Sequence, residues 1–212
     1  MTPTRAVFLD ALGTLVELEP PAVHLRRVLN DELPEERLDA AVRAEMNFYR
    51  DHSHQARDPA SLAVLRERSA AVLSEQLGRP VDVETLMRAI RFRAFPDAAP
   101  ALSALRARGL KLVCVSNWDC ALPQVLEGLG LGPRLDAALS SAAAGARKPD
   151  PAIFAAALEL AGCDPGEALH VGDSREEDVA GARAAGIRGL LIDRGGGGDL
   201  ASLSEIEDHL AR

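Results

Sequence analysis

Cysteine is scarce in this sequence, and so are lysine and long apolar runs. The three cysteines, Cys114, Cys120 and Cys163, are an odd number at scattered positions, which excludes a disulfide framework. They form no Cys-x-x-Cys pair for zinc, so we expect a reducing, cytoplasmic location. No apolar run reaches the roughly 18 residues of a membrane span, and the opening residues lack the apolar stretch of a signal peptide. We therefore expect no membrane contact.

Positive charge is also in short supply. The net charge is −8, which argues against a general nucleic-acid-binding protein. Only two lysines, Lys111 and Lys148, accompany 22 arginines, a bias that reflects codon composition and gives no evidence of phosphate binding. The shortage makes Lys148 conspicuous. With 47% hydrophobic and 26% charged residues, the 212-residue chain has the composition and length of a globular domain carrying an insertion.

Short apolar runs alternate with segments of helical periodicity. The runs expected as strands are Ala6–Leu9, Leu110–Val115, Leu135–Leu139, Ala168–Val171 and Gly189–Ile192. The segments expected as helices are Ala98–Arg108, Ala121–Leu129, Pro151–Leu160 and Asp178–Ala185. This alternation predicts an α/β fold, a Rossmann-like, doubly wound parallel sheet with helices on both faces.

Residues 19–95 interrupt the alternation, because this stretch has helical patterns and no convincing strand. We interpret it as a helical cap inserted into a core that comprises residues 1–18 and 96–212. The hinge would fall near Val16–Pro20 and Phe95–Asp97, and Asp97 would cap the helix that follows. Beyond Gly195–Gly198, expected as a flexible joint, the capping-box pattern Ser202–Glu205 predicts one last helix.

Polar residues follow three of the expected strands. Asp10 follows the first, Ser116 and Asn117 follow the second, and Asp173 follows the fourth. Because the carboxyl ends of parallel strands share one crevice, these side chains should meet there, and Lys148 could reach the same place. Two carboxylates in one crevice repel unless a cation intervenes, and an all-oxygen site favours Mg²⁺ over zinc.

Each of these residues also has a purely structural interpretation. An aspartate after a strand often forms a turn or caps a helix, and Lys148 could be a solvated loop residue. Their common position at the ends of successive strands favours a shared site. An ionised Asp10 beside a charge-neutralised electrophile is the arrangement for covalent nucleophilic catalysis.

The sequence resembles the haloacid dehalogenase-like hydrolase superfamily over essentially its whole length. The resemblance rests on four ordered motifs: Asp10–Leu15, Val115–Asn117, Lys148–Pro151, and Gly172–Ser174 with Asp178. The stretch after the first motif resembles the small helical cap of that superfamily.

The resemblance implies a role for each motif residue. Asp10 would be the nucleophile and a magnesium ligand, Asp173 a second ligand, and Asp178 a support for the ion, directly or through water. The main-chain carbonyl of Leu12 would complete the metal site. The remaining roles fall to Ser116 and Asn117, which would bind the transferred group, and to Lys148, which would orient and neutralise it.

Leu12 departs from the phosphatase pattern, in which this position holds a second aspartate acting as general acid and base. Losing such a group typically costs about 10²–10⁴ in rate. The dehalogenases of the superfamily also lack it, yet the pair Asp173 and Asp178 resembles a magnesium signature that they do not have. We therefore expect a magnesium-dependent phosphatase of a small phosphorylated molecule. The alternatives are a 2-haloacid dehalogenase-type hydrolase and a catalytically weak binding protein.

Other residues near the expected crevice are open to two interpretations. Trp118 and His170 are most simply packing residues of the core. Arg43 and Arg50 lie about two turns apart on one helix side, which would suit an anion, although a solvated helix face explains them more simply. Further cap residues that could face the substrate are Tyr49, His52 and His54. The sequence predicts neither the substrate nor the oligomeric state.

Overall fold

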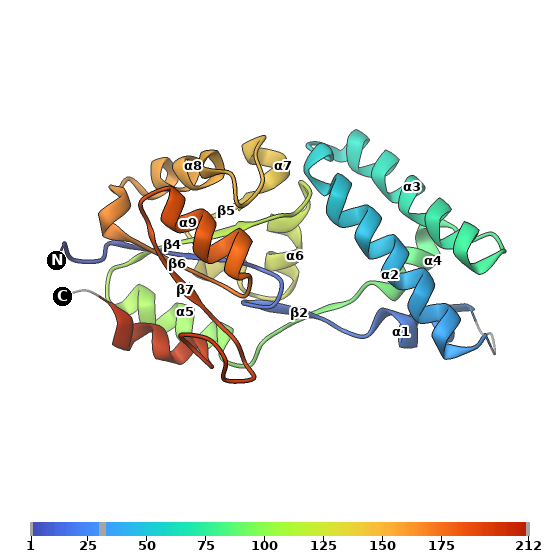
Figure 1. Cartoon of the computed structure of the whole chain (residues 1–212), viewed down its shortest axis with the longest axis horizontal. Helices are drawn as coiled ribbons and strands as arrows, with labels where there is room; N and C mark the ends of the chain where they lie inside the picture. Colours follow the sequence, from blue (N-terminus) through green and yellow to red (C-terminus); the bar gives the residue numbers. More distant parts are fainter. Residues whose placement is uncertain (1, 30–32, 211–212) are drawn as a thin grey trace.

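A five-stranded parallel sheet lies at the centre of the larger part of the molecule (Figure 1). The computed structural model describes residues 2–29 and 33–210. The strand order is β5-β4-β1-β6-β7, with neighbours paired in parallel. The strands are β1 (Ala6–Leu9), β4 (Lys111–Ser116), β5 (Ala137–Ser140), β6 (Ala168–Gly172) and β7 (Arg188–Leu191). The predicted doubly wound α/β fold is therefore confirmed, and each expected strand lies within two residues of its predicted bounds.

Both faces of the sheet are buried, which explains why its strands read as apolar runs. In β1, Val7 and Leu9 belong to the core on one face, and Ala6 and Phe8 to the core on the other. The first face packs against α5 (Ala98–Ala107), α6 (Leu122–Gly128) and the 3₁₀ helix η5 (Leu203–His209). The second face packs against α8 (Pro151–Ala161) and α9 (Gly181–Ala184), close to α7 (Ser141–Ala144). Two further short 3₁₀ turns are η2 (Gly132–Arg134) and η3 (Pro165–Glu167).

The helices between β2 and β3 form a separate layer with a core of its own, which we call the helical unit. It comprises α1 (Pro21–Leu29), α2 (Glu35–His52), η1 (Ser53–Gln55), α3 (Pro59–Leu77) and α4 (Val83–Ala89). Figure 1 shows it at the opposite end of the molecule from most of the sheet. Leu25, Leu38 and Leu73 are among the buried residues that hold these helices together. None of the described helices has both the length and the apolarity that a membrane crossing needs.

Two short strands connect the helical unit to the sheet, and one of them contradicts the sequence prediction. β2 (Val16–Leu18) pairs antiparallel with β3 (Phe92–Ala94). β3 lies within residues 19–95, where we expected no strand. Three residues are too few to display an alternating pattern, and their pairing arises because the chain leaves and re-enters the sheet domain at the same place.

The expected helix Asp178–Ala185 is irregular in the structure. Residues Arg175–Ala180 form the π-helical turn η4, and α-helical geometry begins only at Gly181. The turn starts at Ser174, whose hydroxyl accepts a hydrogen bond from the Glu177 amide at 3.1 Å. Asp178 therefore belongs to a π-helical turn, a distortion often found at functional sites.

The C-terminal segment also differs from its prediction. The last helix is present, but as the 3₁₀ helix η5, and the Ser202 hydroxyl accepts from the Ser204 amide instead of forming a capping box. Gly195–Gly198, expected as a flexible joint, form a turn in which Asp193 accepts hydrogen bonds from two glycine amides. Residues 1 and 211–212, the ends of the expected core, lie outside the described residues.

Asp97 stands at the N-cap position of α5, but its carboxylate does not cap that helix. Oδ2 accepts instead from the Leu203 amide at 2.9 Å, the Ser202 hydroxyl at 2.8 Å and the Arg194 guanidinium at 3.0 Å. The predicted cap is therefore wrong, because partners from the distant C-terminal segment occupy the carboxylate.

Candidate active site

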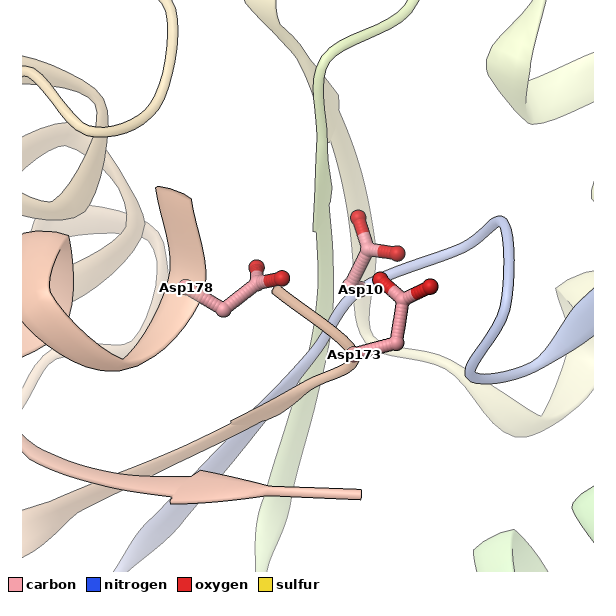
Figure 2. A group of neighbouring side chains, drawn as sticks. All are labelled: Asp10, Asp173 and Asp178. Carbon is pink, nitrogen blue, oxygen red and sulfur yellow. The ribbon is translucent and has the colours of Figure 1, made fainter. Parts of the chain in front are cut away.

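Three aspartates meet at the carboxyl ends of β1 and β6. Asp10 directly follows β1, Asp173 directly follows β6, and Asp178 reaches them from η4. Figure 2 shows the carboxylates of Asp10 and Asp173 side by side, with Asp178 pointing toward them. Each residue offers a carboxylate oxygen that lies within 4.8 Å of the other two. The crevice lies where the strand order reverses, the usual position of ligand sites in such sheets.

Lys148 joins two of these carboxylates. Its ammonium nitrogen lies 2.5 Å from Oδ1 of Asp10 and 2.5 Å from Oδ1 of Asp178. The side chain is 1% exposed, so this lysine is far from the solvated loop residue that its sequence context also allowed. The Ser116 hydroxyl donates to the same Asp10 oxygen at 2.9 Å. Oδ1 of Asp10 is thus held by two donors.

Asp178 is fixed by contacts from several sides. His170 Nε2 lies 2.8 Å from its Oδ1, and the Ser174 amide donates to its Oδ2 at 3.0 Å. His170 is a strand residue that also packs edge-on against Phe154, with 5.1 Å between ring centroids. The packing role expected for His170 is present, and its contact with Asp178 is an addition that the sequence did not reveal.

Asn117 holds the backbone of Lys148 in place. Its Oδ1 accepts from the Lys148 amide at 2.8 Å, and its Nδ2 donates to the Lys148 carbonyl at 3.0 Å. Nδ2 also donates to Oε2 of Glu177 at 3.0 Å. Sequence reasoning missed Glu177, because an exposed-looking acid among three consecutive acidic residues carries no distinguishing signal. Whether Asn117 also binds a transferred group stays a prediction.

Two glycines permit the close approach of these groups. A Cβ atom at Gly13 would lie 2.0 Å from Oδ2 of Asp173, and Gly13 also has a φ of +85°. A Cβ atom at Gly172 would lie 2.1 Å from Cγ of Asp178. No residue larger than glycine fits at either position without moving an aspartate.

The carboxylates carry more negative charge than the Lys148 ammonium neutralises. Burial raises the pKa of Asp10 from its ordinary 3.8 to about 6, with Lys148 opposing the rise and Asp178 and Asp173 adding to it. Desolvation and the charge of Asp178 likewise raise the pKa of Asp173. Burial is the main cause of both rises, and repulsion between the carboxylates adds to it, as expected of a site where one ammonium faces three carboxylates.

The pKa values of Asp178 and Lys148 shift in the direction that favours their charged forms. Burial by itself would raise the pKa of Asp178, but Lys148 and His170 bring the pKa below its ordinary value. Burial by itself would lower the pKa of Lys148, but Asp10 and Asp178 raise it. Lys148 is therefore charged and shared between Asp10 and Asp178, and among the described residues Asp173 is the carboxylate of the group that has no ion-pair partner. A divalent, oxygen-preferring cation fits this donor set.

A cavity of about 660 Å³ extends from these groups to the helical unit. Arg43, Tyr49 and Arg50, three of the residues expected to face a substrate, line it. His52 instead bonds to the Phe48 carbonyl at 2.7 Å and stacks on the Phe48 ring, and His54 is outside the lining.

Two residues beside the nucleophile shape the same cavity. Trp118 is buried and packs against Phe92 with ring centroids 5.0 Å apart, which confirms a packing role, and its edge also lines the cavity. Leu12 lines it as well and is 38% exposed. The Leu12 side chain therefore cannot donate a proton to a group bound beside Asp10.

Comparison with known proteins gives the family. A family model described as haloacid dehalogenase-like hydrolase matches residues 4–186. The chain therefore belongs to the haloacid dehalogenase-like hydrolases, as the four motifs predicted.

The individual relatives differ from one another in name. Haloacid dehalogenase-like hydrolase domain-containing protein 3 of Bos taurus is 48% identical over 101 residues, which cover 48% of this chain and 40% of the relative. The chain thus spans about two fifths of that relative's length. Phosphoglycolate phosphatase of Rhodospirillum rubrum is 34% identical over 211 residues, covering 90% of this chain and 80% of the relative.

A solved structure of a different activity has the same fold. L-2-haloacid dehalogenase from Xanthobacter autotrophicus matches with a TM-score of 0.69 and 25% identity, over 99% of this chain and 89% of that one. Phosphatases and dehalogenases thus share this architecture, and the side chains of the site must distinguish them.

Proposed function

We propose that this hydrolase is a magnesium-dependent phosphatase that acts on a small phosphorylated molecule in the cytoplasm. The observation that carries the proposal is that three carboxylates meet at this site, whereas the ammonium of Lys148 contacts only two of them, Asp10 and Asp178. A dehalogenase-type reaction needs no cation and would not explain why two further carboxylates surround the nucleophile. The phosphatase name of the relative from Rhodospirillum rubrum supports the same conclusion.

Asp10 is the proposed nucleophile. Its Oδ1 is engaged by Lys148 and Ser116, which leaves Oδ2 to attack the phosphorus atom. A bond forms between Oδ2 and phosphorus while the bond from phosphorus to the leaving oxygen breaks, giving an aspartyl phosphate. Water then hydrolyses this intermediate and regenerates the Asp10 carboxylate.

The metal would be held by oxygen ligands. Asp10 and Asp173 would bind the ion together with the main-chain carbonyl of Leu12. Asp178, whose oxygens already contact Lys148, His170 and the Ser174 amide, would support it from a more distant position or through water. When bound, Mg²⁺ would neutralise charge on the phosphoryl group and on the attacking carboxylate.

The remaining motif residues serve the phosphoryl group. With substrate bound, the Lys148 ammonium would neutralise phosphoryl oxygens and the Ser116 hydroxyl would turn from Asp10 to donate to them, while Asn117 keeps the Lys148 backbone in position. The helical unit, proposed as the cap domain of residues 19–95, covers the cavity. It excludes water during the first step and admits it for the second.

Leu12 limits the range of substrates. Without an acid at this position, a poor leaving group such as an alkoxide departs without protonation, which costs about 10²–10⁴ in rate. Aryl phosphates and acyl phosphates have stable leaving groups and suffer less. We therefore expect fast turnover of phosphates with good leaving groups and slow turnover of simple alkyl phosphates.

A dehalogenase-type activity is the second candidate, and the observation in its favour is the apolar Leu12 beside the nucleophile. A halide leaves without a proton, so this reaction tolerates leucine. It would proceed in the presence of a chelator, whereas the proposed phosphatase would stop.

The test measures phosphate release from p-nitrophenyl phosphate with Mg²⁺ and with a chelator, and halide release from 2-chloropropionate under both conditions. The proposal expects phosphate release with Mg²⁺ only, abolished in Asp10→Asn. Halide release in chelator would establish the second candidate. Neither activity would point to the third interpretation, a weakly catalytic binding protein, whose stoichiometric partner a pull-down would recover with Asp10→Asn as well as with wild type.

A further inference from the structure

The cavity contains an acidic residue that the proposed reaction does not use. Glu45 on α2 follows Leu38, Ala41 and Val42 on the buried face of that helix and is 5% exposed. No lysine, arginine or histidine in the described part of the chain forms an ion pair with it. A charged residue on an apolar helix face with no cationic partner is costly and calls for an explanation.

Ser69 on α3 lines the same cavity as Glu45. It is 2% exposed, and its hydroxyl makes no hydrogen bond of acceptable geometry, although it lies close enough to Glu45 to lower the pKa of that carboxyl. Burial acts in the other direction and raises the pKa of Glu45 overall. The Ser69 hydroxyl is thus a buried polar group without a hydrogen-bond partner, beside a buried carboxyl that has no ion-pair partner among the described residues.

Both side chains line the cavity that contains Asp10 and Lys148. Glu45 is near Tyr49, whose pKa it helps to raise, and the Tyr49 hydroxyl donates to Oδ2 of Asp119 at 2.9 Å. Asp119 lies in the loop that follows β4 and the proposed phosphoryl-binding residue Ser116. Glu45 therefore lines the cavity from the helical unit, near the Tyr49 side chain that reaches the loop after β4.

The lining of the cavity on the side of the helical unit is mixed, with Arg43, Arg50 and Arg66 as well as apolar side chains. The apolar ones include Leu65, Leu86, Met87 and Ile90. The apolar side chains suit the carbon portion of a ligand, and the acid with its neighbouring hydroxyl suits one strong donor. A cationic donor suits this place best, because it gives the buried carboxylate the positive partner that the protein does not supply.

We propose that Glu45 and Ser69 form a subsite for a primary ammonium group on the leaving portion of the substrate. The ligand class is then a small phosphorylated amine, with the phosphoryl group at Asp10 and the ammonium at Glu45. By the leaving-group argument for Leu12, a phosphate ester of an amino alcohol would bind there and turn over slowly, whereas an amine that carries an aryl or acyl phosphate would turn over faster. This inference rests on the proposed phosphatase function and narrows its substrate class.

The experiment compares two ligands that differ only in the donor. O-phosphoethanolamine and propyl phosphate have the same chain length, with an ammonium in one and a methyl group in the other. Each is measured as a competitive inhibitor of p-nitrophenyl phosphate hydrolysis in the presence of Mg²⁺. We expect wild type to bind O-phosphoethanolamine about 10- to 100-fold more tightly, the range of one charge-assisted hydrogen bond.

Substitutions then assign the preference to the subsite. Glu45→Gln should bring the ratio of the two inhibition constants close to one, and Ser69→Ala should reduce it. Glu67→Gln, an exposed acid on α3 outside the cavity lining, should leave the ratio unchanged. Equal inhibition of wild type by the two compounds, or a preference that survives Glu45→Gln, would overturn the proposal.

The two proposals fail in different ways. Absence of p-nitrophenyl phosphate turnover would reject the phosphatase function, and calorimetric titration of the protein with the same two ligands and Mg²⁺ would still decide the subsite. Turnover without discrimination between the ligands would reject the ammonium subsite alone.

Discussion

Asp10 and Asp178 share one ammonium group, since Lys148 Nζ lies 2.5 Å from Oδ1 of each. One aspartate follows a strand and the other belongs to a π-helical turn, so the lysine joins two elements as well as two charges. This shared contact fixes the free oxygen of Asp10 toward the cavity and leaves Asp173 as the carboxylate without a cation. The predictions below follow from this arrangement.

Removing the Lys148 charge should destabilise the metal-free protein. In Lys148→Met, Asp10 and Asp178 remain buried without their cation, so the free energy of unfolding should fall by about 3–5 kcal/mol. Lys111→Met is the matched control, because Lys111 is more than half exposed and bridges Asp136 at 3.3 Å; its effect should stay below about 1 kcal/mol. Urea denaturation of both variants in chelator measures the difference, and equal losses would contradict the account.

Magnesium affinity should depend on pH through Asp10. Because the pKa of Asp10 is raised to about 6, a proton occupies it at lower pH and competes with the ion. The apparent affinity should rise about tenfold per pH unit below 6 and level off above it. Calorimetric titration with MgCl₂ at pH 5, 6, 7 and 8 tests this, and an affinity that is constant over the range would count against Asp10 as a ligand.

The same shift affects the stability of the metal-free protein. Between the ordinary pKa of 3.8 and about 6, folded Asp10 retains a proton that the unfolded chain has released. The contribution of Asp10 to the free energy of unfolding should therefore decrease as the pH rises through this window. Asp10→Asn removes the titrating group, so chemical denaturation at pH 4 and pH 7 should show a smaller decrease in this variant. An unaltered decrease would assign the titration to another group.

Introducing an acid at Leu12 should increase turnover of alkyl phosphates. Leu12→Asp would place a carboxyl group in the cavity beside Asp10, where it can protonate a leaving alkoxide. We expect kcat/KM for an alkyl phosphate to rise by about 10² and that for an aryl phosphate to change much less. Leu12→Asn is the control of matched size and polarity. An equal gain from asparagine would show that polarity, and not proton transfer, causes the increase.

Enlarging Gly172 should disturb Asp178. A methyl group there would lie 2.1 Å from Cγ of Asp178, so the carboxylate must shift and its contact with Lys148 must change. Gly172→Ala should reduce magnesium affinity and turnover by at least tenfold. Gly166→Ala, where a Cβ atom meets nothing within 4 Å, should alter neither. Wild-type affinity in Gly172→Ala would mean that the position of Asp178 matters little.

Arg194 should control the junction between the sheet and the helical unit. It donates to the Thr14 carbonyl at 2.8 Å and to Asp97 at 3.0 Å, and its guanidinium lies 3.6 Å from the centroid of Phe95. Thr14 lies two residues before the first proposed hinge segment, Val16–Pro20, and Phe95 and Asp97 belong to the second, so one side chain links these two regions of the chain.

If cap movement limits turnover, Arg194→Gln should change kcat and KM together. Arg108→Gln, which removes an exposed ion pair with Glu207, should change neither. Steady-state kinetics of both variants checks the prediction. A loss of thermal stability in Arg194→Gln with unchanged kinetics would limit Arg194 to a structural role.

The arrangement of the sheet could be predicted from the sequence because its strands are buried on both faces. Each of them is therefore a continuous apolar run, and the polar residues that end the runs at Asp10, Ser116 and Asp173 mark one edge of the sheet. The same reasoning placed Lys148 in the site. The strand β3 escaped prediction, since a three-residue strand has no pattern and exists through its pairing with β2.

Contacts that depend on distant partners were not predictable. Asp97 has the sequence position of a helix cap, yet Arg194 and the Leu203 amide take its carboxylate. The contacts of His170 and the Ser174 amide with Asp178 depend on the π-helical turn, and no sequence pattern predicts that turn. Glu45, by contrast, had a readable signal, because it occupies the apolar face of a periodic helix.

Chemical trapping of the intermediate tests the central claim most directly. The protein is mixed with Mg²⁺ and p-nitrophenyl phosphate, quenched rapidly with sodium borohydride, and digested for mass spectrometry. An aspartyl phosphate would be reduced to homoserine at residue 10, and the account predicts this conversion only when Mg²⁺ and substrate are both present. Phosphate release with an unmodified Asp10, or reduction at Asp173 or Asp178 in its place, would contradict it.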